Sequence, residues 1–99
     1  MSHLEIISPY LTKITADNKT LDQEAFDKAL EKLEPYVAQL LKGNMNDVFS
    51  LLYKLDVSEE KVKFILFGDH QDQTSKLLAE AILQREIVRR FFRLKYSAK

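Results

Sequence analysis

Residues 73–96, QTSKLLAEAILQREIVRRFFRLKY, decide the fold of this chain. Apolar side chains recur there at steps of three and four, without glycine or proline, and this pattern predicts one continuous amphipathic helix. At about 1.5 Å of rise per residue such a helix is about 36 Å long. A compact domain of this chain length is only about 33 Å across, so the helix is expected to span the domain or to project from it.

The apolar side chains of this helix fall on two arcs. We expect the first arc to face the core; it comprises Leu77, Leu78, Ala81, Ile82, Val88, Phe92 and Tyr96. The second arc is separated from the first by polar positions and comprises Leu83, Ile87, Phe91 and Leu94. Because a surface helix needs only one apolar stripe, two stripes indicate burial on two sides. The second arc is therefore expected to be covered by the N-terminal segment or by another subunit.

The charge of the chain is divided between this helix and the rest of the protein. The whole chain contains 15 Lys and Arg and 15 Asp and Glu, so its net charge is zero. Residues 85–99 contain six cations, including all four arginines, against one acid, a net charge of +5, so the remaining residues carry −5. This segregation favours association of the protein with itself or docking to an acidic partner. The alternative is that the cations only complement the helix macrodipole.

The composition favours one all-α domain. The chain has 99 residues, the size of a small domain, and only two glycines and two prolines. An all-β chain needs many more turn residues. No repeat or linker divides the chain, so residues 1–99 are expected to form a single helical domain. We predict a compact bundle of four to five helices with a long C-terminal helix.

The N-terminal half contains one clear helix signal. Residues 1–20 are interpreted as a short helix that starts at Ser8, or alternatively as a flexible, extended arm. Thr20 has capping-box spacing to a glutamine, so a helix is expected to start there and to end at Gly43. Pro35 lies inside this segment and is expected to kink or break it, because proline has no N–H to donate.

Two shorter helices, 44–56 and 58–67, are expected next. Asn44 or Asn46 caps the first, and Ser58 caps the second, since these side chains accept hydrogen bonds from first-turn N–H groups. The first of the two helices is apolar over much of its girth, which favours a central position in the bundle.

Several classes of protein are excluded or disfavoured by composition. The chain has no cysteine, so it forms no disulfide and no thiolate zinc site. No apolar run approaches the roughly 18 residues that a membrane span needs. The N-terminal residues lack the basic start and apolar stretch of a signal peptide. We therefore expect a cytoplasmic protein.

Side-chain patterns typical of catalysis or metal binding are not evident. Asp69-His70-x-Asp72 is the only segment in which a histidine lies among carboxylates, and three ligands from one short loop rarely converge on a metal. We interpret it as a polar turn in which Asp72 caps the last helix. Ser50, Ser58 and Ser75 have no histidine neighbour in sequence, and no glycine-rich loop is present to cradle phosphate. We expect no enzyme activity, no cofactor, no metal and no small-molecule substrate.

Nucleic-acid binding is the alternative function. Helices 44–56 and 58–67 have the order of a helix-turn-helix, but the second begins with two acids and has no Arg, Asn or Gln to read bases. An arginine cluster in the last helix is a better candidate for contacts with phosphates, although the chain as a whole is neutral. The cluster comprises Arg85, Arg89, Arg90 and Arg93. A membrane-surface role is disfavoured, because the cations lie between two apolar arcs instead of flanking one.

These patterns favour a non-enzymatic protein–protein interaction module that forms a homodimer through its last helix, or that binds a helical protein partner. In this interpretation the apolar contact is made by the second arc, Leu83, Ile87, Phe91 and Leu94. Arg90 and Arg93 pair with acids of the neighbouring subunit. The candidate acids lie in the helix that precedes Pro35 and are Asp27, Glu31 and Glu34.

Overall fold

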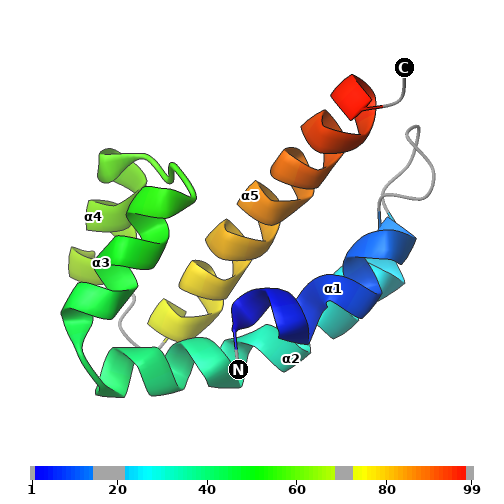
Figure 1. Cartoon of the computed structure of the whole chain (residues 1–99). Coiled ribbons are helices and arrows are strands. Elements are labelled where there is room, and N and C mark those ends of the chain that lie inside the picture. Colours follow the sequence, from blue (N-terminus) through cyan, green and yellow to red (C-terminus); the bar gives the residue numbers. More distant parts are fainter. Residues whose placement is uncertain (1, 15–21, 69–72, 98–99) are drawn as a thin grey trace.

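The chain folds into helices only, as its composition predicts. The computed structural model describes residues 2–14, 22–68 and 73–97, with side chains up to residue 93. These residues form five α-helices and no strand (Figure 1). The helices are α1 (His3–Ile14), α2 (Gln23–Lys42), α3 (Met45–Lys54), α4 (Glu59–Phe67) and α5 (Thr74–Ser97). The all-α bundle and its long C-terminal helix are therefore confirmed.

Polar side chains at the helix starts and a glycine at a helix end set the boundaries of α2, α3 and α4. Asn44 and Ser58 each accept a hydrogen bond from a first-turn N–H, so both predicted caps are confirmed. Asp22 caps α2 in the same way. The cap predicted at Thr20 falls outside the described residues. Gly43 ends α2 as predicted, and its N–H donates to two carbonyls of the last turn.

Both prolines lie inside helices, and neither helix begins or ends at its proline. The helix predicted to start at Ser8 begins at His3, so Pro9 lies within α1. Of the kink or break predicted at Pro35, the break does not occur, because α2 continues through Pro35 as one helix of 20 residues. In each helix the lost backbone hydrogen bond is offset by a buried apolar stripe that runs on both sides of the proline. These stripes comprise Ile7, Leu11 and Ile14 in α1, and Ala29, Leu33 and Val37 in α2.

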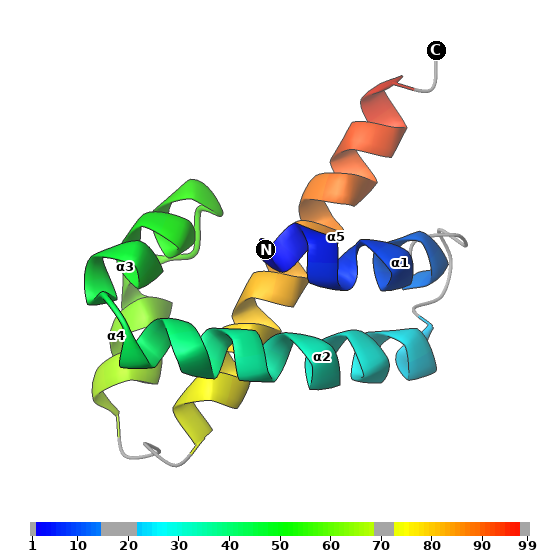
Figure 2. The same ribbon diagram turned by 60° about the horizontal axis from the view of Figure 1, so that its bottom comes forward.

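The first half of α5 lies between two pairs of helices. In Figures 1 and 2, α1 and α2 lie on one side of it, and α3 and α4 lie on the other. Its side chains are consequently buried around most of the helix circumference. The buried residues of this half are Leu78, Ala79, Ala81, Ile82 and Leu83.

The second half of α5 extends past the ends of the other helices (Figures 1 and 2). The molecule is accordingly elongated, with principal extents of 41 × 26 × 24 Å. Whether a side chain of α5 is buried therefore depends more on its position along the helix than on which of the two apolar arcs it belongs to. Leu83, expected on the outward arc, is 0% exposed, whereas Val88 and Phe92 of the expected core arc are exposed. The side chains of Leu94 and Tyr96 lie outside the described residues.

Leu83 offers a test of this packing. We predict that Leu83→Ala lowers the free energy of unfolding by about 2–5 kcal/mol, because it leaves a cavity in the core. Urea denaturation followed by circular dichroism measures the change. Val88→Ala is the control, and it should cost clearly less because Val88 is partly exposed. Equal stabilities for the two variants would contradict the position of Leu83 in the core.

Candidate functional site

The projecting part of α5, residues 87–97, presents apolar surface and is called the α5 tip below. Val88, Phe91 and Phe92 are exposed there, and Phe92 is 46% exposed. The rings of Phe91 and Phe92 lie edge to face, with centroids 5.9 Å apart. Ile87 is half-buried against the core at the base of the tip. The predicted contact residues therefore divide: Leu83 belongs to the core, Ile87 to its margin, and Phe91 to the surface.

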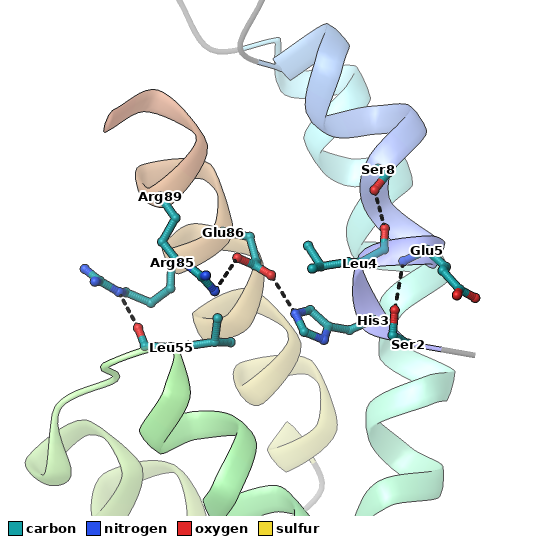
Figure 3. A network of polar contacts seen from close by, with 9 residues as sticks. All are labelled: Ser2, His3, Leu4, Glu5, Ser8, Leu55, Arg85, Glu86 and Arg89. Atoms are coloured by element: carbon teal, nitrogen blue, oxygen red, sulfur yellow. Dashed lines mark hydrogen bonds and ion pairs between the residues drawn. The ribbon is translucent and has the colours of Figure 1, made fainter. Parts of the chain in front are cut away.

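A buried polar cluster joins α1 to α5 at the base of the tip (Figure 3). His3 Nε2 lies 2.6 Å from Glu86 Oε2, and Arg89 Nη1 donates to Glu86 Oε1 at 3.2 Å. The Glu86 side chain is only 4% exposed, so its charge has lost most of its hydration. Two partners on its two oxygens compensate for this loss. The cluster fixes the position from which the tip projects.

Sequence reasoning missed this cluster. A helix that starts at Ser8, or a flexible arm, leaves His3 outside the core, yet His3 is a buried residue of the first helical turn. One local signal was present, because Glu86 is the only acid of residues 85–99 and precedes Arg89 by one turn. Its partner on α1 is 83 positions away in the chain, and no local pattern reports such a pairing.

The four arginines of the predicted cluster do not act alike. Arg85 donates from Nε to the carbonyl of Leu55 at 2.8 Å, which ties α5 to the end of α3 (Figure 3). Arg89 pairs with buried Glu86, so these two arginines serve the fold. Arg90 and Arg93 lie further along α5 and line a small cleft of about 140 Å³ beside the exposed Leu4.

A groove between α3 and α4 is the second apolar surface. Its volume is about 780 Å³, and its walls include Phe49, Tyr53 and Phe67. Tyr53 is 86% exposed and Phe67 is 74% exposed, which is unusual for such large apolar rings. Two acids, Asp56 and Glu59, stand at the turn between the two helices and also line the groove.

The groove corrects the position expected for helix 44–56. That helix, α3, is peripheral. It packs against α2 on one side, and apolar side chains on another side of it line the groove. It buries only Val48, Leu52 and the capping Leu55. The sequence signal was an apolar circumference larger than one contact can cover. We interpreted it as central burial, but the same pattern also fits a helix with an open face.

Other kinds of site were sought in the described part of the chain. It contains no group of three or more His, Cys, Asp or Glu side chains placed to hold a metal ion. The segment Asp69–Asp72 lies outside the described residues. Among the helices of residues 3–97, none has the length and apolar character needed to cross a membrane.

The His3–Glu86 contact can be tested by a double-mutant cycle. We predict that His3→Ala and Glu86→Ala each lower the free energy of unfolding by about 1–3 kcal/mol, because each leaves a buried polar partner unpaired. The double variant should lose less than the sum of the two single losses. Glu5→Ala is the control, because it replaces an exposed acid of α1, the helix that also carries His3. Strict additivity in urea titrations would show that the two side chains are not coupled.

Comparisons with known proteins identify no relative. A scan of protein-family models, a search of curated proteins and a search of solved structures each found no match to this chain. Its function is therefore inferred from the chemistry of its own surfaces.

Proposed function

We propose that the protein is a small, non-enzymatic interaction module that associates with a second copy of itself through the α5 tip. The observation that carries this proposal is the exposure of Val88, Phe91 and Phe92 on a helix that has left the bundle. Clustered apolar side chains on a projecting element mark interaction sites in soluble proteins, because covering them removes apolar area from water.

The charge of the tip supports a protein partner. Arg90 and Arg93 flank the exposed Phe91 and Phe92 in sequence, and arginine and aromatic side chains are both enriched at protein interfaces. Residues 85–99 carry a net charge of +5, and the rest of the chain carries −5. A second copy therefore offers the opposite charge to that of the tip. One candidate binding surface for the tip on that second copy is formed by three acids of α2, Asp27, Glu31 and Glu34.

The base of the tip supports the same proposal. The His3–Glu86–Arg89 cluster and the Arg85–Leu55 hydrogen bond hold α5 from two sides just before the tip begins. A surface that is already ordered loses less conformational entropy when it binds. The tip is thus presented to a partner as a preformed helix.

Nucleic-acid binding through the arginine cluster ranks below self-association. Arg85 and Arg89 form hydrogen bonds to Leu55 and Glu86, so these two arginines of the cluster already serve contacts within the chain. The neighbouring surface is apolar and aromatic. The lack of cysteine fits a reducing compartment, and we propose a cytoplasmic location on that ground.

Phe92→Asp tests the proposed self-association. The wild-type protein is expected to scatter light as a dimer at about 100 μM, a concentration that reveals even micromolar affinity. The variant should have the mass of one chain, 11.6 kDa, because the new carboxylate cannot be buried without a partner. Phe64→Asp replaces an exposed phenylalanine of α4 and is the matched control.

A wild-type mass of one chain at this concentration would refute self-association. Loss of helical circular dichroism in Phe92→Asp would show instead that Phe92 supports the fold. The variant is therefore compared with wild type by both measurements.

The nucleic-acid alternative is tested by gel shift. We expect no shift of duplex DNA or single-stranded RNA at about 50 mM salt, where phosphate contacts are strong. A shift that weakens with added salt and is lost in Arg90→Gln/Arg93→Gln would favour the alternative function.

A further inference from the structure

We propose that the groove between α3 and α4 binds the α5 tip of a second copy, and that two copies exchange tips reciprocally. This inference rests on the proposed self-association, because it names the surface that receives the tip. The groove takes the place of the acids of α2 as the binding surface for the tip.

The groove has the properties of a site for a helix. It lies between two helices, measures about 780 Å³ and is walled by Phe49, Tyr53, Val62 and Phe67. Tyr53 and Phe67 leave most of their surface in water. An amphipathic helix laid along such a groove buries its apolar face against both walls. The occupant should therefore be a helix with exposed aromatic or aliphatic side chains.

The α5 tip is such a helix, and its own chain cannot insert it. Both views of the molecule show the tip leading away from α3 and α4 (Figures 1 and 2). Its base is held by the hydrogen bond from Arg85 to Leu55 and by the contact between His3 and Glu86. A tip anchored in this way reaches a groove only on another copy.

The chemistry of the tip matches that of the groove. Asp56 and Glu59 line the groove and can pair with Arg90 and Arg93 of the incoming tip. Lys63 also lines the groove, and its Nζ lies 3.8 Å from Oε1 of Glu59. Asp56, Glu59 and Lys63 together therefore carry one negative charge. Guanidinium groups also stack on aromatic rings such as that of Tyr53, which adds attraction that does not depend on a carboxylate.

The acids of α2 are not combined with exposed aromatic walls as the acids of the groove are. Its acids Asp27 and Glu31 are exposed, but Asp27 already accepts a hydrogen bond from Gln23 at 2.8 Å. Its fully buried apolar stripe, Ala29, Leu33 and Val37, faces the core of its own chain. The apolar groove of about 550 Å³ that α2 shares with α1 is lined by Pro35, Tyr36 and Lys32, and neither Asp27 nor Glu31 is among its lining residues. The groove between α3 and α4 supplies both acids and aromatic walls.

Reciprocal exchange gives the association a closed form. In a two-fold dimer each contact occurs twice, so the area buried by one tip in one groove is doubled. One short helix in one groove buries little area for a stable complex, whereas two such contacts approach the size of specific interfaces.

Intermolecular paramagnetic broadening locates the tip. A ¹⁵N-labelled wild-type chain is mixed with an equal amount of unlabelled Ser97→Cys protein that carries a nitroxide at the end of α5. The chain has no other cysteine, so the label attaches at one position. We expect loss of amide signals in α3 and α4 around Tyr53, Val62 and Phe67, and recovery after the nitroxide is reduced.

The outcomes separate this inference from the proposed function. Signal loss confined to α2 or α5 of the labelled chain overturns the groove as the binding site but keeps self-association. No signal loss, together with the mass of a single chain in light scattering, overturns both. Species that keep growing with concentration overturn the reciprocal arrangement, because open head-to-tail contacts form chains.

A pair of phenylalanines on α4 supplies a matched test. Phe67 lines the groove, whereas Phe64, also exposed on the same helix, is not among its lining residues. We expect Phe67→Asp to raise the dimer dissociation constant by at least about tenfold and Phe64→Asp to leave it nearly unchanged. Circular dichroism checks that both variants remain folded. Equal effects of the two substitutions would overturn the inference.

Discussion

The packing of the first half of α5 between two pairs of helices is the constraint on which the rest of the structure depends. Leu78, Ile82 and Leu83 have almost no exposed surface, because α5 packs chiefly against α2 and also against α1 and α4. Removal of α5 would expose the buried stripes of the other helices at once. The same packing determines where the helix leaves the bundle, and hence which of its residues remain at the surface.

Much of the architecture could be predicted, because helix periodicity and caps are local. The caps at Asn44 and Ser58, the stop at Gly43 and the length of the last helix all follow from neighbouring residues. Burial could not be predicted equally well. Leu83 and Val88 lie on the same helix, and only the arrangement of the other four helices determines which one is covered.

The candidate surface was predicted in part, for a related reason. Phe91 and the arginines were identified from one helix, but the roles of Arg85 and Arg89 depend on Leu55 and Glu86 as actual neighbours. The groove between α3 and α4 forms only where the two helices meet, so the sequence of neither helix alone reveals it. The apolar girth of helix 44–56 predicts a central position, because the pattern of a buried helix and that of a helix with an open face are the same.

The sequence separation of His3 and Glu86 also determines when their contact can form during synthesis of the chain. His3 precedes Glu86 by 83 positions, so it leaves the ribosome long before its partner is synthesised. Until then α1 and α2 can pair locally, but the face that α2 presents to α5 stays open to water. The core between α2 and α5 therefore forms only once α5 has been synthesised, and until then the nascent chain exposes an apolar stripe of the kind that chaperones bind.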